Sequence, residues 1–157
     1  MIKIKVVVID RTRSAFLKKG ESSYIERIEK YVKFQWVEVK SVPIRKGEKR
    51  DLVLGREEAN IIKRLNPSEF LVALDRSGKQ YKSEEFSAWL KNLSAYYSGW
   101  VVFVIGGPLG LSRNILNRSN NVLSLSKMTF THEMSRLILL EQIYRALTII
   151  QGEKYHK

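Results

Sequence analysis

Residues 100–111 of the chain read WVVFVIGGPLGL, an uninterrupted apolar run that ends in a glycine-rich turn. A short apolar run of this kind, bounded by glycines, is typical of a strand that helices cover on both faces. A second such run, Val6 to Ile9, lies near the amino terminus. Both runs predict an α/β fold with a mostly parallel sheet, in which Val6 to Ile9 form a central strand.

Strand-like and helix-like patterns alternate along the rest of the chain, and no low-complexity linker or internal repeat divides them. At 157 residues the chain has the size of one domain, so we expect a single domain over residues 1–157. Besides the two runs above, the patterns predict strands at 34–42, 70–74 and 121–125, a turn at 75–78, and helices at 16–31, 54–65, from Ser83, at 113–118, and from a Thr131 cap to Gly152.

Composition narrows the classes of function. Lys and Arg number 28 against 16 Asp and Glu, a net charge of +12 that favours a nucleic-acid partner. Without cysteine and with two histidines, the chain offers no thiolate or histidine-rich metal centre, so no metal is expected. The apolar runs are too short for a membrane span and no signal-peptide pattern is visible, so we expect a cytoplasmic protein.

The last predicted helix is apolar around most of its circumference. Since one buried face does not require this much apolar surface, we expect its outer face, with Leu140, to join a second copy of the chain. The alternative is that the helix is enclosed within one domain.

Three late turns follow the carboxyl ends of predicted strands, at 74–78, 106–111 and 125–130. Ligands of open α/β sheets bind in the crevice outside such strand ends. The glycines at 106, 107 and 110 permit positive φ and a close approach of backbone to a ligand. Ser124, Ser126 and Thr129 alternate with apolar residues, as in a pocket for a partly polar heterocycle. The alternative remains open that Gly-Gly-Pro is only a tight turn after a buried strand.

The combination of motifs in the second half resembles the RlmH (YbeA) family of small SPOUT methyltransferases, which methylate N3 of a pseudouridine in large-subunit ribosomal RNA. The resemblance covers essentially the whole chain and is densest from Leu74 onward. It is carried by LDRSGK at 74–79, IGGPLGL at 105–111, LSLSKMT at 123–129, His132, Arg136, EQ at 141–142, YRA at 144–146 and YHK at 155–157.

The resemblance implies a C-terminal trefoil knot, a homodimer through the last helix, and a terminal tail that brings Tyr155 and His156 to the substrate. It also implies a ribosomal RNA, large-subunit or assembled-ribosome partner. The cofactor it implies is S-adenosylmethionine, held largely by backbone groups. The residues that match the cofactor turns are Leu74, Gly106, Gly107, Leu125, Ser126, Lys127, Met128, Thr129 and Phe130.

Methyl transfer to a ring nitrogen requires alignment and a group that weakens the N3–H bond. Candidates for that group are His132, His156 and Asp75; for His132 we favour a structural or phosphate-contacting role over that of the base.

Several basic residues are candidates for contact with RNA phosphate. Arg136 has no carboxylate four residues away on its helix and is therefore assigned to RNA. Arg145 follows Glu141 by four residues and can pair either with that carboxylate or with an RNA phosphate. The cluster Arg45, Lys46, Lys49 and Arg50 is also assigned to RNA, with a solvated loop as its alternative. Two other functions stay open: methylation of another structured RNA, and noncatalytic binding of RNA or the ribosome.

Overall fold

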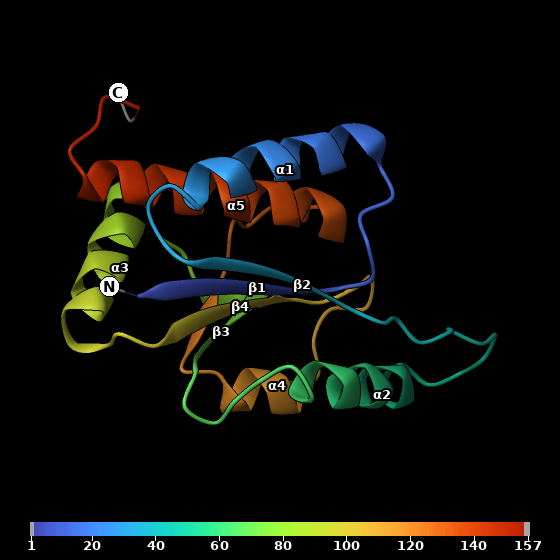
Figure 1. Ribbon diagram of the computed structural model, residues 1–157. Coiled ribbons are helices and arrows are strands. Elements are labelled where there is room, and N and C mark those ends of the chain that lie inside the picture. Colours follow the sequence, from blue (N-terminus) through green and yellow to red (C-terminus); the bar gives the residue numbers. More distant parts are fainter. Residues whose placement is uncertain (1, 156–157) are drawn as a thin grey trace.

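The computed structural model describes residues 2–155, which form five strands and five helices in alternating order (Figure 1). The elements are β1 (Lys3–Ile9), α1 (Ala15–Ile28), β2 (Phe34–Val39), α2 (Arg50–Ile62), β3 (Phe70–Lys79), α3 (Ser83–Tyr96), β4 (Trp100–Ile105), α4 (Arg113–Arg118), β5 (Asn121–Leu123) and α5 (His132–Ile150).

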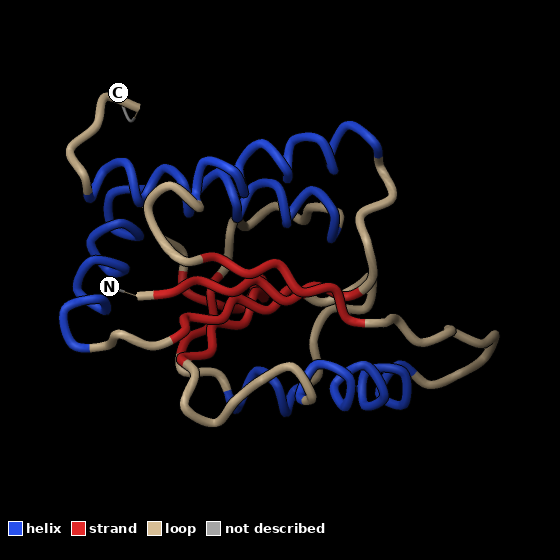
Figure 2. Tube along the Cα trace, viewed as in Figure 1, coloured by secondary structure: helices blue, strands red, loops and turns tan. Residues whose placement is uncertain are grey.

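The strands form one parallel sheet in the order β2-β1-β4-β3-β5. Helices α1 and α5 cover one face of the sheet, and α2 and α4 cover the other (Figure 2). Every residue of β1 after Lys3 is buried. The structure therefore confirms the predicted α/β class and the central position of the Val6 to Ile9 run, and the strand at Trp100–Ile105 has the predicted bounds.

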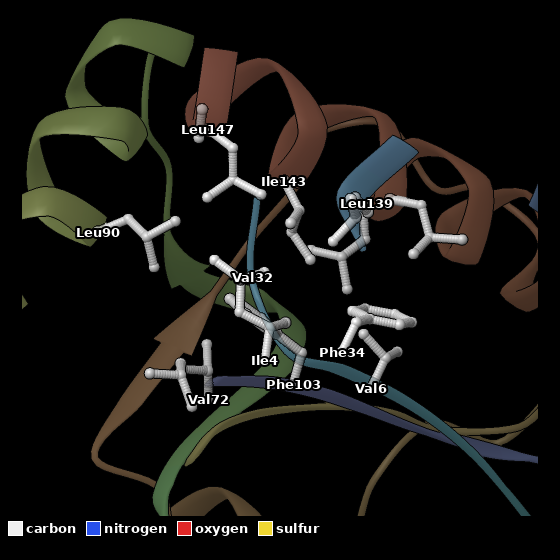
Figure 3. Packing of buried hydrophobic residues seen from close by; sticks show 14 of the residues in the cluster. Ile4, Val6, Val32, Phe34, Val72, Leu90, Phe103, Leu139, Ile143 and Leu147 are labelled. Carbon is white, nitrogen blue, oxygen red and sulfur yellow. The ribbon is translucent and has the colours of Figure 1, made fainter. Parts of the chain in front are cut away.

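Alternate side chains of β1 enter two separate apolar clusters, as the two-residue period of a strand requires. On the upper face, Ile4 and Val6 point toward Leu139 and Ile143 of α5 (Figure 3). Helix α1 lies close beside α5 at Gly20, where a Cβ atom would be 2.9 Å from the side chain of Leu137. This packing fixes α5, and with it the site at its first turn.

Several predicted boundaries are wrong. Helix α2 begins at Arg50, four residues before the expected start. Strand β3 continues to Lys79, although the pairing register with β5 breaks between Leu74 and Lys79, so the expected turn is an irregularity inside the strand. Within it, Asp75 Oδ2 accepts a hydrogen bond of 2.9 Å from the Ser77 backbone N–H. Ser83 is the first residue of α3 rather than its cap.

The expected outer position of Leu140 is also wrong. Its side chain is fully buried in the core, because α5 packs against α1, α3 and the sheet at once. These three neighbours account for much of the apolar circumference of the helix without a second chain. The homodimer and the trefoil knot stay predictions.

Candidate functional site

A cleft of about 580 Å³ lies at the carboxyl ends of β3, β4 and β5. Its volume falls within the range of small-molecule sites. The irregular segment at 74–76 of β3 and the loops that follow β4 and β5 form most of its wall, together with the first turn of α5. The structure thus brings together the turns that the sequence placed at one sheet edge. Among the expected cofactor residues, those that line the cleft are Leu74, Gly106, Gly107, Leu125, Ser126, Met128, Thr129 and Phe130; Lys127 does not.

The glycine turn closes through contacts between its own backbone atoms. A Cβ atom on Gly106 would lie 2.4 Å from the carbonyl carbon and oxygen of Gly110, whereas one on Gly107 would meet Ile9 at an ordinary 3.4 Å. Of the three glycines, Gly110 alone has a left-handed φ, +79°. The expectation of positive φ at Gly106 and Gly107 is therefore wrong, and Gly106 is the position where no side chain fits.

Hydroxyl groups fix the loop that follows β5. Ser124 Oγ donates to the carbonyl of Ser126 at 3.1 Å, and Ser126 Oγ accepts from the backbone N–H of Met128 at 3.0 Å. Asp75, the carboxylate candidate for a base, also lines the cleft, but its Oδ2 already accepts from the Ser77 hydroxyl at 2.5 Å. The cleft therefore has a mixed lining of apolar side chains, hydroxyls and charged groups.

His132 is the first residue of α5 and lines the cleft, half-buried, directly after the Thr131 cap. Burial lowers the pKa of the His132 imidazole below its usual 6.5, and the positive charge of Arg136 lowers it further. The ring is consequently neutral at pH 7 and offers a nitrogen lone pair inside the cleft. Its neighbour Glu133 accepts hydrogen bonds from the backbone N–H groups of Arg13 and Ser14, at 2.6 and 3.0 Å.

Arg136 does not face RNA. Its side chain is 0% exposed, and its guanidinium donates to the carbonyl of Ile9 and to the hydroxyl of Thr12. Its assignment to phosphate is corrected, because a phosphate has no access to a guanidinium enclosed between β1, the following loop and α5. The missing carboxylate at i±4 reflects partners that come from another part of the chain.

Tyr155 lies at the far end of α5 from the cleft. Its hydroxyl donates to Glu141 Oε1 at 3.2 Å, and its ring packs edge-on against Tyr144. Burial raises the pKa of the Tyr155 phenol above its usual range. Glu141, which holds this hydroxyl, is nine residues along α5 from His132, about 13.5 Å of helix, so Tyr155 lies away from the His132 of its own chain. His156 lies outside the described residues.

The basic loop, defined by Arg45, Lys46, Lys49 and Arg50, joins β2 to α2 and projects beyond the sheet edge (Figure 1). All four residues are exposed, and Arg50 also lines the cleft, where it donates to the carbonyl of Leu109 at 2.6 Å. Arg145 instead pairs with Glu141 at 2.6 Å, under the ring of Tyr155. The basic loop therefore borders the cleft, and Arg145 does not.

Leu17, Glu133 and Ser135 line the cleft although the sequence patterns did not indicate them. Leu17 reaches the cleft from α1, and Glu133 ties the cleft wall to the loop before α1. Nothing in the local pattern around Leu17 indicates this position, because it depends on how α1 packs across the sheet. Glu133 adjoins His132 in the sequence, so its proximity was foreseeable.

Within residues 2–155, no group of three or more His, Cys, Asp or Glu side chains is arranged to hold a metal ion. No helix in the same part of the chain is long and apolar enough to cross a membrane.

The chain belongs to the SPOUT methyltransferases: the family model described as predicted SPOUT methyltransferase matches residues 2–156. Its curated relatives include proteins named ribosomal RNA large subunit methyltransferase H. The one from Cytophaga hutchinsonii is 40% identical over 157 residues, covering 99% of each chain, and the one from Dictyoglomus thermophilum is 41% identical over 153 residues, covering 98% of each. These relatives confirm the family resemblance drawn from the motifs.

Solved structures support the fold. A probable methyltransferase from Bordetella pertussis Tohama I aligns with a TM-score of 0.58 at 12% identity, over 93% of this chain and 95% of that one. A probable methylase family protein from Haemophilus influenzae Rd KW20 aligns with a TM-score of 0.55 at 15% identity, over 100% of this chain and 72% of that one.

Proposed function

We propose that the chain transfers the methyl group of S-adenosylmethionine to N3 of a pseudouridine in large-subunit ribosomal RNA. The single observation that carries this proposal is the cleft in which the three family-matching turns meet at one sheet edge. The relatives named ribosomal RNA large subunit methyltransferase H support the RNA substrate, because they match at about 40% identity over nearly the full length. Ribosomes lie in the cytoplasm, so we place the activity there.

The lining of the cleft suits the cofactor. S-adenosylmethionine supplies an activated methyl group, and it is part polar, part apolar. The closed turn at Gly106 lines the cleft with backbone, while Leu74 and Leu125 supply apolar surface and Ser126 and Thr129 supply hydroxyls. The chain's own task is then to orient the target base and to receive its N3 proton.

His132 is suited to that proton transfer. Its neutral imidazole lies inside the cleft and can accept a proton at pH 7, which the buried Arg136 guanidinium cannot do. The competing role is a neutral hydrogen bond to phosphate. A His132→Gln variant separates the two, because glutamine keeps a hydrogen-bonding side chain but does not accept a proton. Loss of methyl transfer with unchanged RNA affinity supports the base.

The tail assignment requires a second chain. Because Tyr155 is held at the far end of α5, we propose that Tyr155 and His156 serve the cleft of a partner in a homodimer. Helices α1 and α5 lie side by side with their outer surface turned away from the sheet (Figure 1), and the exposed Phe16 adds apolar area there. In this dimer α5 still contributes to the interface, as expected. The outer surface of α1 and α5 forms it, and the buried Leu140 does not take part.

The basic loop supplies the RNA contacts of this proposal. Its four cations are exposed, one of them, Arg50, lines the cleft, and the chain carries a net charge of +12. Phosphate contacts of this kind position an RNA without reading its sequence. Arg145 stays a candidate for RNA contact, although it would have to exchange its pairing with Glu141.

Calorimetry with S-adenosylmethionine, followed by transfer of a labelled methyl group to large ribosomal subunits, tests the function. We expect stoichiometric cofactor binding and label in the RNA. Binding of RNA without binding of S-adenosylmethionine identifies a noncatalytic RNA-binding protein instead. Label that enters a different structured RNA, and not the large subunit, identifies another substrate.

A further inference from the structure

A second cleft, of about 570 Å³, lies between the end of β3 and the exposed side of α3. We call it the aromatic groove and define it by Lys79, Tyr81, Trp89, Asn92 and Tyr96, which line it. None of these residues belongs to the methyl-donor cleft described above. Its wall combines three aromatic rings with the cation of Lys79 and the side-chain amides of Gln80 and Asn92.

The rings of the groove are held in two different ways. Trp89 stacks on Phe86, with ring centres 5.6 Å apart and planes 22° apart, and Tyr81 packs against it at 6.1 Å. Tyr96, by contrast, is 78% exposed at the end of α3. A fixed aromatic wall next to an exposed ring is suited to receive a flat ligand, because little side-chain freedom is lost on binding.

The polar groups indicate which flat ligand fits. The ammonium group of Lys79 lies 4.6 Å from the centre of the Tyr81 ring, at the edge of the groove, and Asn92 adds amide donors and an acceptor. The groove also contains the Glu85 carboxylate, which is already engaged by the backbone N–H of Lys82 at 2.8 Å. Aromatic rings beside a cation and an amide are the features that bind an unpaired nucleobase and its phosphate.

The groove and the methyl-donor cleft adjoin at Ser124, which lines the cleft and is hydrogen-bonded to two residues of the groove. The Ser124 backbone N–H donates to the carbonyl of Lys79 at 2.9 Å, and Gln80 Nε2 donates to Ser124 Oγ at 3.4 Å. Ser124 lines the first cleft from the other side. One RNA strand with its target in the first cleft can therefore place another nucleotide in the groove.

We propose that the aromatic groove binds an unpaired base of the RNA substrate, stacked on Tyr96 and Trp89 with Lys79 at its phosphate. This proposal rests on the proposed function for the class of substrate. An RNA is favoured over a protein partner because the chain carries a net charge of +12 and Lys79 places a cation at the groove.

The test compares Tyr96→Ala with Tyr96→Phe, which keeps the ring. Affinity for protein-free large-subunit ribosomal RNA is measured by filter binding, and affinity for S-adenosylmethionine by calorimetry. Tyr96→Ala is expected to weaken RNA binding about tenfold, the effect of losing one stacked base, while Tyr96→Phe stays within about twofold. Cofactor affinity is expected to be unchanged in both variants, since Tyr96 lies outside the first cleft.

Wild-type RNA affinity in Tyr96→Ala overturns the proposal. A loss of affinity that occurs only with intact large subunits also overturns it, because a ribosomal protein is then the occupant. Loss of the dimer in light scattering overturns it as well, because the groove is then a subunit interface. If the wild-type chain transfers methyl groups and Tyr96→Ala binds RNA normally, only the role of the groove is contradicted and the proposed function stands. A wild-type chain that binds neither this RNA nor ribosomes overturns both the groove and the proposed function.

Discussion

The guanidinium of Arg136 donates a hydrogen bond of 2.9 Å to the hydroxyl of Thr12, and these two side chains are 0% and 4% exposed. The same hydroxyl donates to Glu21 Oε1 at 2.6 Å. A buried polar chain thus links α5, the loop after β1, and α1. Because α5 also carries His132, this chain of contacts holds one wall of the cleft in place.

Replacing Arg136 by Met is expected to lower the free energy of unfolding by about 3 kcal/mol, because it leaves buried polar partners without their donor. Urea denaturation measures the loss. The matched control is Arg113→Met, which removes an exposed arginine from α4 and is expected to cost less than about 0.5 kcal/mol. Equal losses in the two variants would contradict the buried role of Arg136, as would wild-type stability combined with weakened RNA binding.

Glu57 predicts a pH-dependent stability. Burial raises the pKa of this carboxyl above its usual 4.5, so the folded state favours the neutral form. Its contribution to stability is therefore complete below pH 4.5 and is lost as the pH rises through the raised pKa. Glu57→Gln is expected to raise the melting temperature relative to wild type at pH 8 and to leave it nearly unchanged at pH 4.

The control for this comparison is Glu29→Gln, which removes a carboxylate from an exposed position just after α1. Thermal melts of the three proteins at both pH values are required. A Glu57→Gln variant that is less stable than wild type at pH 8 would show that the ionised carboxylate stabilises the fold, which contradicts the expected cost of its burial.

Gly106 and Gly107 are expected to respond differently to the same added methyl group. Gly106→Ala places a Cβ 2.4 Å from the Gly110 backbone and distorts the turn, so S-adenosylmethionine binding should weaken at least about tenfold, a change of about 1.4 kcal/mol. Gly107→Ala meets only ordinary contacts and should bind within about threefold of wild type, or 0.7 kcal/mol by the same relation. Calorimetry that finds the reverse order would contradict the claim that the close backbone contact at Gly106 shapes the cofactor site.

The tail is expected to act between chains. A protein that lacks residues 153–157 and a Gly106→Ala protein should each be weakly active, whereas a mixture of the two should recover methyl transfer. Recovery occurs because one chain supplies an intact cleft and its partner supplies Tyr155. Single-turnover assays after subunit exchange measure this effect. A mixture no more active than its components would show that each tail serves no neighbouring cleft.

The local sequence pattern was sufficient to predict the bounds of some elements. The apolar run at Trp100–Ile105 and the short helix at Arg113–Arg118 have the bounds that the sequence predicts, because composition and flanking residues define them. The meeting of the three turns was also predictable, since parallel strands all end at one edge. The irregularity in β3 was not, because it depends on Gly78 packing against the backbone of Val122.

Long-range partners explain the remaining errors in the site. Arg136 and Thr12 are separated by 124 positions, so no spacing rule within the helix indicates that this arginine is buried. The distance of Tyr155 from the cleft follows from the direction of α5, which starts at the cleft and leads away from it. The family resemblance points to Tyr155 as a functional residue, but it does not show whether Tyr155 serves the cleft of its own chain or that of a partner.

The most direct test of the central claim is nucleoside analysis of large-subunit ribosomal RNA after incubation of large subunits with the wild-type protein and labelled S-adenosylmethionine. We expect one labelled nucleoside, a pseudouridine methylated on N3, whose formation falls strongly with Gly106→Ala and is retained with Gly107→Ala. Ribosomal RNA that contains no label after incubation with protein shown by calorimetry to bind the cofactor would contradict it.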